Sequence, residues 1–461
     1  MRALEVLAVL ALRVGLSVVH PQCISSNDSF PSPTSIDLNA FIGFNMKLFA
    51  EVLPEIGNFV FSPYTVWRSL LLVYFGAEGK TLRELEWAMP FFDKAEDLAI
   101  FKATTLMYEG PDAFESLFAS SSRLYLDDSI PVKDCVFNVF KENITLVDFD
   151  QPLLAAQRIN SAVAEDTRGM VPEAVSAGRL RGKQAMSVSA AFFKGAWEQP
   201  FRPEYTAQEK FFPENDVYVT LDMMHHVGHF RKTHSKTLRA SVLELPFLGE
   251  SASMLVVLPD KMNINTDLKL VLSKLERSKK SVFFVSAKAR TKVSVKMPKF
   301  TVESAVKESL KQALRHLNVS DIFSENADLS TYIDVDGKGG LKKENGIGGE
   351  LGGVGREEEG KLIGERGKGE GGITKARVNA IVEKAMLVID EGGLSPGLAG
   401  NPNPAGRVIR RTRLFECDRP FAFLIVGNKN KAILFMGVYR GPREDLIRGI
   451  DDYSQMKRET N

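Results

Sequence analysis

The sequence predicts an α+β fold, with helices concentrated in the first part of the chain and strands in most of the rest. Apolar residues recur at helical spacing from Ile36 to Phe49 and again from Tyr64 to Tyr74. From Ser187 onward, short runs rich in branched and aromatic residues replace that spacing, as strands require. Because the two patterns do not alternate regularly, repeated βαβ units are excluded.

The first elements follow from local signals at their ends. Asn58-Phe-Val-Phe-Ser-Pro63 predicts a short strand that stops at a proline. Ser62 and Pro63 suit the cap and the first turn of the next helix. Thr81-Leu-Arg-Glu84 has the spacing of a capping box and predicts the start of another helix.

The later elements are mostly short strands. Strands are predicted at Ser187–Trp197, Ser241–Leu245, Met254–Leu258, Val282–Val285, Val293–Met297 and Ala385–Ile389. A helix is predicted at Ser304–Leu317, and a closing hairpin joins Phe421–Val426 to Ala432–Tyr439.

Composition and charge exclude several classes of function. The 461 residues are 44% hydrophobic and 25% charged, with a net charge of +1. A near-zero net charge gives no electrostatic reason to bind nucleic acid or a bulk membrane surface. After the N-terminus, no run of about 18 apolar residues occurs, so we expect no membrane span. The protein is expected to be a monomer.

The N-terminus predicts a secretory signal over residues 1–22 and therefore an extracellular protein. Arg2 is followed by the apolar run Val6–Leu12, which Arg13 interrupts before Val14–Val19 resumes it. The alternative is an N-terminal segment with no targeting role. The chain ends in a polar tail over residues 443–461.

The cysteines and the glycosylation sequons also bear on whether the protein is secreted. The three cysteines are too few for a disulfide framework, and a bridge between Cys135 and Cys417 is one option that spacing does not decide. In a secreted chain, the sequons at Asn27, Asn143 and Asn318 are candidate glycosylation sites.

One internal segment does not fit a compact domain. Residues 337–372 are mostly Gly, Glu, Lys and Arg, so they cannot bury enough surface to offset the entropy of ordering them. We interpret them either as a disordered surface insertion or as a translated intron.

Motifs for enzyme chemistry fail on physical grounds. Gly393-Leu-Ser-Pro-Gly397 matches a nucleophile elbow, but Pro396 has no N–H to donate to an oxyanion. All six histidines also precede Ser395, whereas that hydrolase order places the histidine after the serine. The chain is therefore not expected to be an enzyme.

Metal and cofactor signals are equally weak. His225, His226 and His229 lie close together, but no cysteine or carboxylate stands at ligand spacing and Gly228 interrupts a helix. Gly367-Lys-Gly-Glu-Gly-Gly372 matches a dinucleotide fingerprint without a strand before it. We expect neither a metal nor a cofactor.

A loop rich in Gly, Pro, Asn and Arg carries the remaining signal. Residues 392–412 follow a predicted strand and are expected to be exposed and open to cleavage. Arginines lie within it at Arg407, Arg410 and Arg411, and Arg413 follows directly after it. An accessible guanidinium is what the acidic pocket of a trypsin-like protease binds. The alternatives are that these arginines keep the loop soluble or bind a polyanion.

From about Ile36 to Pro442 the chain resembles a serpin, because a set of short stretches occurs in that family's order. They are Asn58–Pro63, Gly76–Thr81, Ile159-Asn160 with Thr167 and Gly169, Phe192–Trp197 with Phe201, Leu243–Phe247, Ser253–Pro259, Met297–Phe300, Asp328–Ser330, Arg419–Phe421 and Leu434–Gly437. The segment 337–372 departs from the family, which has a short connection there.

The resemblance implies three sheets, about nine helices and an exposed reactive-centre loop. It also implies a mechanism in which a protease cleaves the loop, which then enters the central sheet as a new strand and traps the protease. Trp197 resembles the tryptophan found where that sheet opens.

The resemblance also sets the register of the loop. Glu383–Met386 and Ile389–Glu391 match the strand that leads into the hinge, and Gly393 then takes the place of the hinge glycine. The hinge runs over Glu391, Gly392, Gly393, Leu394, Ser395 and Pro396. Counting forward places the scissile bond at Arg407-Val408. Cleavage at Arg410, Arg411 or Arg413 is the alternative, and furin-like proteases are a second target class.

The hinge departs from the inhibitory pattern. Inhibitory serpins carry a small hydroxyl residue followed by alanines, whereas this hinge contains Pro396, which cannot donate a hydrogen bond to a neighbouring strand. A non-inhibitory serpin acting as a carrier, chaperone or cleavable substrate is therefore the alternative to an inhibitor.

Overall fold

The computed structural model describes residues 38–91, 93–110, 117–215, 217–261, 264–277, 283–334, 376–392 and 412–442. The predictions for residues 1–22, 337–372 and 443–461 lie outside these ranges, as does most of the loop from 393 to 411. Within the described ranges, every helix is too short or too polar to span a bilayer.

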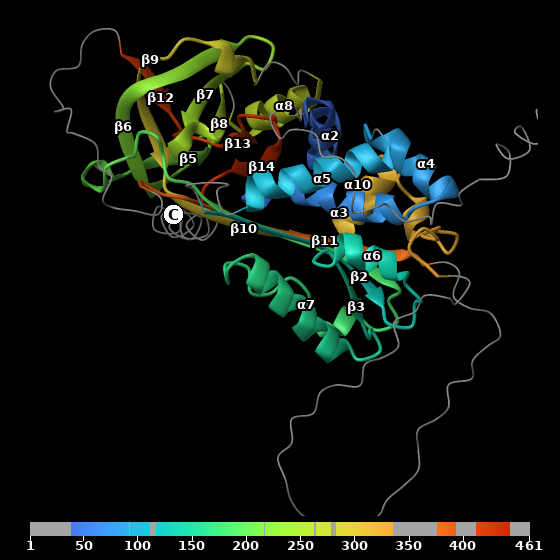
Figure 1. Ribbon diagram of the computed structural model, residues 1–461. Helices are drawn as coiled ribbons and strands as arrows, with labels where there is room; N and C mark the ends of the chain where they lie inside the picture. The colour runs from blue at the N-terminus through green and yellow to red at the C-terminus, as the bar shows by residue number, and fades with distance from the viewer. Residues whose placement is uncertain are drawn as a thin grey trace, which may run out of the picture.

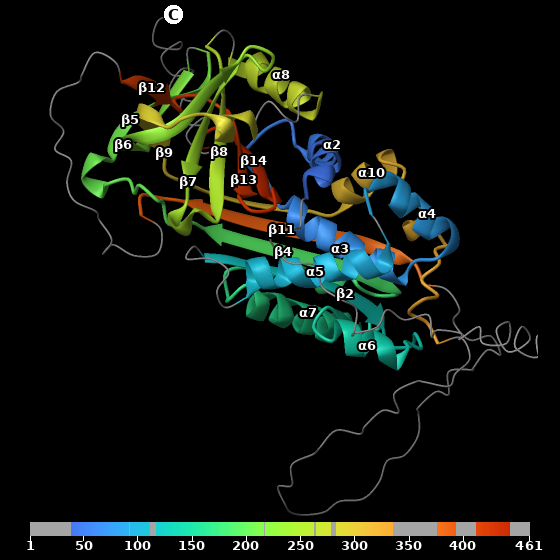
Figure 2. The same ribbon diagram turned by 45° about the horizontal axis from the view of Figure 1, so that its top comes forward.

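A five-stranded central sheet organises the molecule (Figure 2). In spatial order its strands are β10 (Phe300–Val306), β11 (Val378–Ile389), β4 (Ala185–Lys194), β2 (Leu117–Asp127) and β3 (Ile144–Val147). β11 pairs antiparallel with β10 but parallel with β4, and β4 pairs antiparallel with β2. The centre of the sheet is therefore a parallel junction between antiparallel pairs.

The remaining strands form a nine-stranded assembly at one end of the central sheet (Figure 1). They are β1 (Phe59–Phe61), β5 (Ala207–Glu214), β6 (Val217–Ser235), β7 (Ala240–Pro246), β8 (Ala252–Pro259), β9 (Thr291–Pro298), β12 (Arg413–Glu416), β13 (Phe421–Gly427) and β14 (Ile433–Tyr439). The 19-residue β6 pairs with β5 and β9 over its first part and with β7 at its end. It thus joins two smaller sheets, which with the central sheet make the three that were expected.

Eight α-helices lie in the described part of the chain. They are α2 (Ile42–Val52), α3 (Pro63–Gly76), α4 (Gly79–Ala88), α5 (Lys94–Glu109), α6 (Asp134–Phe140), α7 (Pro152–Asp166), α8 (Ile264–Arg277) and α10 (Glu308–His316). α7 covers one face of the central sheet, and α3 and α5 cover the other (Figure 1). Each face has its own apolar cluster, and Ile159 of α7 packs with Val188 and Phe192 of β4.

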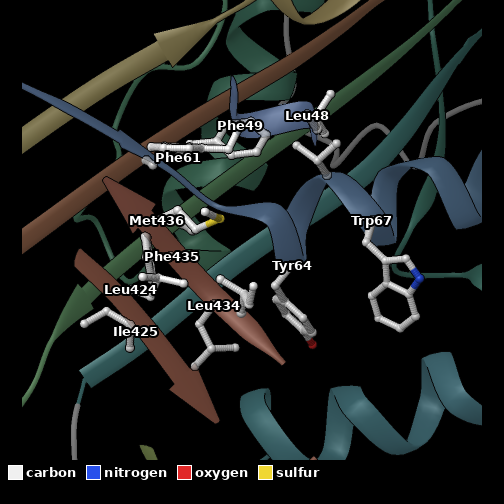
Figure 3. Close-up of a cluster of buried hydrophobic side chains, with 14 of the residues drawn as sticks. Leu48, Phe49, Phe61, Tyr64, Trp67, Leu424, Ile425, Leu434, Phe435 and Met436 are labelled. Atoms are coloured by element: carbon white, nitrogen blue, oxygen red, sulfur yellow. The ribbon is translucent and has the colours of Figure 1, made fainter. Parts of the chain in front are cut away.

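The larger cluster lies on the other face, between α2, α3 and the β13–β14 hairpin (Figure 3). Phe61 contributes from β1, Tyr64 from the start of α3, and Leu434 and Met436 from β14. All four are buried. Burial on this scale stabilises the fold by about 1.5–3 kcal/mol for each large apolar side chain.

The predicted boundaries around α3 are confirmed. Ser62 caps the helix by accepting a hydrogen bond from Thr65 N at 3.3 Å, and Pro63 occupies the first turn. The predicted closing hairpin is also confirmed as β13 and β14.

The capping box at Thr81 is wrong. α4 begins two residues earlier, at Gly79, so Thr81 lies inside the helix. Its hydroxyl donates to Asp321 Oδ2 at 2.6 Å, and Glu84 accepts from the backbone N–H of Asp321 at 2.7 Å. The motif therefore fastens a distant turn rather than capping its own helix.

Two other elements differ from the prediction. Residues 304–306 belong to β10, and the helix starts only at Glu308, because Phe300–Val306 alternates buried and exposed positions at the period of a strand. The strand predicted at Val282–Val285 is not one: its described residues from Phe284 onward begin a 3-10 turn that ends at Ala287.

The structure excludes the disulfide bridge between Cys135 and Cys417 that the sequence left open. Cys135 is disulfide-bonded, whereas Cys417 is a free, buried thiol, so these two residues do not pair. Burial raises the pKa of the Cys417 thiol well above its usual value. A neutral thiol in the core acts as a small apolar side chain.

Candidate functional site

The site lies where β11 and β4 end side by side, next to the nine-stranded assembly. Trp197 is buried there, and its ring stacks on Phe247 with centroids 4.6 Å apart. Its indole N–H donates to the backbone oxygen of Asp390 at 2.8 Å. Gly195 permits this close packing, because a Cβ at that position would lie 2.3 Å from the Phe247 ring. Trp197 thus fastens the end of β11.

Glu391, the first residue of the predicted hinge, is held by three further contacts. Its carboxylate accepts a hydrogen bond from Thr206 Oγ1 at 2.9 Å and pairs with Lys299 Nζ at 3.0 Å. Its backbone oxygen accepts from Phe201 N at 2.9 Å. Burial acts to raise the pKa of Glu391, but the contacts with Lys299 and Thr206 outweigh it and hold that pKa below its usual value. The carboxylate therefore stays ionised and paired.

Asp390 completes the clasp, which we define as Lys194, Trp197, Thr206, Lys299, Asp390 and Glu391. Lys194, the last residue of β4, pairs with Asp390 Oδ2 at 2.8 Å. The ion pair of Lys194 with Asp390 thus ties the end of β11 to β4. The ion pair of Lys299 with Glu391 ties it to the residue that directly precedes β10. The clasp therefore stabilises the pairing of β11 with β4 at the end where the two strands would have to separate first.

The junction between β11 and β4 is the weaker kind of strand pairing. Its register runs in parallel from Val378 opposite Ala185 to Val388 opposite Lys194. Parallel pairs are slightly less stable per residue than antiparallel ones. A segment that follows Ile389 and folds back along β11 would run antiparallel to both strands. One more strand could therefore be added between β11 and β4 and form antiparallel pairs with both.

The chain leaves the central sheet at Ile389 and enters the other assembly at Arg413, the first residue of β12. Arg413 is exposed, and its register partner is Val293 of β9. Gly392 is described, and a Cβ there would meet nothing within 4 Å. The other predicted loop residues lie outside the described residues: Gly393, Leu394, Ser395, Pro396, Arg407, Val408, Arg410 and Arg411.

Trp197 and Glu391 were predicted to belong to this region, whereas Lys194, Thr206 and Lys299 had no predicted role. Lys194 lies in the quoted stretch Phe192–Trp197 and Lys299 in Met297–Phe300. A motif on one strand does not reveal the charge that faces it across the sheet, because that partner comes from a distant part of the chain.

The three histidines lie on β6, and only two share a face. His225 and His229 are an even number of residues apart and point to the same side, whereas His226 points to the other. His225 Nε2 lies 2.6 Å from Glu209 Oε1. Burial and the charge of Arg202 lower the pKa of His226. Alternation along the strand therefore separates residues that are adjacent in sequence.

A buried carboxyl group lies in the middle of β11. Glu383 is fully buried and faces the start of α3, where one oxygen accepts a hydrogen bond from Ser62 N at 3.0 Å. The other oxygen has no hydrogen-bond partner among the described residues. Burial raises the pKa of Glu383 well above its usual value, against the single hydrogen bond from Ser62. The carboxyl group is therefore proton-bound in the fold at a pH where it is ionised in the unfolded chain.

We expect Glu383 to make stability fall as the pH rises. Above the unfolded pKa of about 4.3, the folded protein binds more protons at Glu383 than the unfolded chain does. The contribution of Glu383 to the free energy of unfolding is therefore complete below that pKa. Above it, the contribution declines by about 1.4 kcal/mol per pH unit until the folded pKa is reached. Urea unfolding of Glu383→Gln at pH 5 to 8 should show a smaller decline than the parent. The exposed Glu86→Gln is the matched control. Equal pH slopes for the parent and Glu383→Gln would contradict this account.

Comparison with a family model gives a match over nearly all of the described chain. The model described as "Serpin (serine protease inhibitor)" matches residues 39–442. That range includes every residue of the clasp and of the β11–β4 junction.

Curated relatives and solved structures agree with that match. Serpin B3 of Homo sapiens is 26% identical over 436 residues, which cover 88% of this chain and 100% of the relative. Serine protease inhibitor 42Dd of Drosophila melanogaster is 30% identical over 80% of this chain and 87% of its own. The crystal structure of serpin-12 of Manduca sexta has a TM-score of 0.70 at 24% identity and covers 87% of this chain and 98% of its own.

Proposed function

Because this chain belongs to the serpin family, we propose that it is an extracellular suicide-substrate inhibitor of trypsin-like serine proteases, with Arg407-Val408 as the bait bond. The supporting observation is the parallel junction of β11 and β4, which the chain leaves at Ile389 to begin the loop. A strand inserted there would replace one parallel pair by two antiparallel ones.

The protease would be trapped during its own reaction. Its serine attacks the carbonyl carbon of Arg407 and forms an ester, and the new N-terminus at Val408 separates. If the loop then enters the sheet before water hydrolyses the ester, the protease is carried away from the end of β11. The clasp opposes this movement, because β11 and β4 must part at Asp390 and Lys194.

The direct test is to mix the purified protein with trypsin and separate the products by denaturing electrophoresis. We expect a covalent band at the summed mass of trypsin and the N-terminal fragment, which disappears when trypsin's serine is blocked beforehand. Cleaved protein without that band would contradict the inhibitor proposal. A parallel reaction with furin tests the second target class, because Arg407-Val-Ile-Arg410 offers a furin-like pattern.

The second candidate function is that of a non-inhibitory serpin, and Pro396 favours it. A proline in an inserted strand removes a ladder hydrogen bond, and Gly397 and Gly400 add entropic cost. Slow insertion would let water release the protease, so the protein would behave as a substrate. If Pro396→Ala increases the fraction of trypsin trapped, the hinge limits insertion. If neither form traps any protease, the non-inhibitory function is favoured.

Secretion is part of the proposal and has support in the described residues. Disulfides persist mainly in oxidising compartments, and Cys135 is disulfide-bonded. Of the two sequons in the described ranges, Asn318 is exposed at the end of α10, whereas Asn143 is half-buried and donates to Ser122 O at 3.0 Å. Asn318 is therefore the better candidate for a glycan, and Asn27 lies outside the described residues.

A further inference from the structure

The three cysteines of the chain differ in their bonding. Cys417 is a free thiol and is fully buried between β12 and β13. Cys135, in the first turn of α6, is half-buried and disulfide-bonded. Cys23 lies outside the described residues. With Cys417 free, Cys23 is the one cysteine of the sequence that remains to pair with Cys135 in the same chain.

The helix that carries Cys135 depends on packing for its stability. α6 has seven residues, and isolated helices shorter than about 12 residues are marginal in water. Val136 and Phe140 are its buried residues, and the Phe140 ring stacks on Phe75 of α3 with centroids 5.3 Å apart. A covalent tie to α6 would therefore support an element that does not hold by itself.

A small hollow lies beside Cys135. α6 forms one wall, and Thr331 and Tyr332 form another. The two walls are fixed to each other, because Lys133 N donates to Tyr332 O at 2.9 Å and Lys133 Nζ donates to Thr331 O at 3.0 Å. The lining is mostly apolar, so a peptide segment bonded to Cys135 would cover apolar side chains there.

The same corner of the molecule holds the weakest edge of the central sheet. α6 joins β2 to β3 and lies beside both strands (Figure 1). Among the described strands, β3 pairs with β2 alone, in parallel, from Ile144 opposite Leu124 to Val147 opposite Asp127. It is the shortest strand pairing of this sheet, and parallel pairs are slightly less stable per residue than antiparallel ones.

We propose that Cys23 and Cys135 form a disulfide that anchors the mature N-terminus in the hollow beside α6 and stabilises the β3 edge. The two thiols lose two electrons and two protons to a disulfide oxidant such as glutathione disulfide, which becomes two thiols. The bond closes a loop of about 110 residues, and a disulfide that closes a long loop restricts the unfolded chain most. This inference rests on the secretion part of the proposed function, not on the inhibitory part.

The bond also limits where the signal can be removed. Cleavage after residue 22, at the end of the predicted signal, leaves Cys23 as the first residue of the secreted chain. Cleavage beyond Cys23 would leave Cys135 as a half-buried thiol without its partner. N-terminal sequencing of the secreted protein should therefore start at Cys23 or before it, and a start after Cys23 would overturn the proposal.

The first test maps the bond in the full-length secreted protein. The unreduced protein is digested with pepsin at acid pH, where thiols are protonated and disulfides do not exchange. We expect a linked pair of peptides that contain Cys23 and Cys135 and that separate on reduction. An alkylating reagent should label Cys417 only after denaturation, because that thiol is buried.

Three outcomes of this mapping would overturn the proposal. They are a free Cys23 in the unreduced monomer, a linked pair that contains Cys417, and a dimer that a reductant separates. If the chain stays inside the cell, the purified full chain is oxidised with glutathione disulfide and mapped in the same way. A Cys23–Cys135 bond in that sample would contradict the extracellular proposal while the pairing stands.

The second test measures what the bond does, without any protease. We expect Cys23→Ser to lower the thermal unfolding midpoint by roughly 10 °C. Cys135→Ser should lower it equally, and the double variant no further, because all three remove the same bond. Dithiothreitol should lower the midpoint of the parent to that of Cys23→Ser and leave Cys23→Ser unchanged.

Cys417→Ala is the matched control, because it removes the cysteine that does not pair. It should keep the full response to dithiothreitol whatever its own midpoint. Equal midpoints for the parent and Cys23→Ser would overturn the stabilising role. If Cys135→Ser fails to fold, Cys23→Ser carries the test, since it leaves α6 unchanged.

Hydrogen exchange locates the effect in the fold. Amides of α6 and β3 should exchange about threefold or more faster in Cys23→Ser than in the parent, and those of β13 and β14 at the parent rate. Faster exchange in β13 and β14 with no change in α6 and β3 would overturn the anchoring at α6.

Discussion

Replacing Arg407 with Ala is expected to slow the capture of trypsin by at least about a hundredfold. The acidic pocket of a trypsin-like protease makes paired, charge-assisted hydrogen bonds with a guanidinium. An alanine leaves that buried carboxylate without a partner, and sites built to hydrogen-bond a substrate group reject an analogue that lacks it by several orders of magnitude. The measurement is the second-order rate of trypsin inactivation.

Arg410→Ala and Arg411→Ala are the matched controls, because each removes one arginine from the same loop. We expect both to inactivate trypsin at nearly the parent rate. A large loss in Arg411→Ala with none in Arg407→Ala would place the bait bond before Thr412 instead. Furin gives an independent check, since its capture should depend on Arg410 as well as on Arg407.

Cleavage of the Arg407-Val408 bond is expected to make the protein markedly more heat-stable. While the loop is intact, residues after Glu391 must reach β12 at Arg413 in the other assembly. Cleavage removes that constraint and frees about a dozen residues to pair with β11 and β4. At about 1 kcal/mol net for each new hydrogen bond, the gain is of the order of 10 kcal/mol.

Before cleavage, the clasp opposes the entry of loop residues between β11 and β4. Lys299 and Lys194 each hold one carboxylate at the end of β11, and Trp197 holds its backbone. These contacts must be released for the first loop residues to enter. Glu383 lies deeper in the same strand, where it contacts Ser62, and takes no part in the clasp.

Much of the fold was predictable because local signals and burial agree. Ser62 and Pro63 mark the start of α3, and the closing hairpin has strands of branched and aromatic residues on both sides of a polar turn. The errors arise where a local pattern serves a distant partner. Thr81 and Glu84 have capping-box spacing, but they bind the turn at Asp321, which lies far along the chain.

The strands β2 and β3 were missed for a similar reason. Residues Ala119–Arg123 of β2 include three serines in a row, which a propensity argument assigns to a loop. All three serines are buried, and their hydroxyls donate to neighbouring elements: Ser120 to Glu109, Ser121 to Asp166 and Ser122 to the backbone oxygen of Thr65. Tertiary contacts therefore override the local preference.

In the candidate site, too, residues in local motifs were predictable, whereas contacts between distant segments were not. The resemblance to a family marked Trp197 and the hinge, because those residues lie in short contiguous motifs. The pairing of Lys299 with Glu391, and that of Lys194 with Asp390, depend on which strands and turns become neighbours. Spacing along one segment carries no information about them.

The central claim is that the segment after Ile389 can become a strand between β11 and β4. Its most direct test is the thermal unfolding midpoint of the protein before and after a single cleavage at Arg407, with the two fragments left together. The account predicts a rise of about 10 °C or more. An unchanged or lower midpoint, with cleavage confirmed by mass, would contradict insertion and with it the inhibitory mechanism, while the fold would stand.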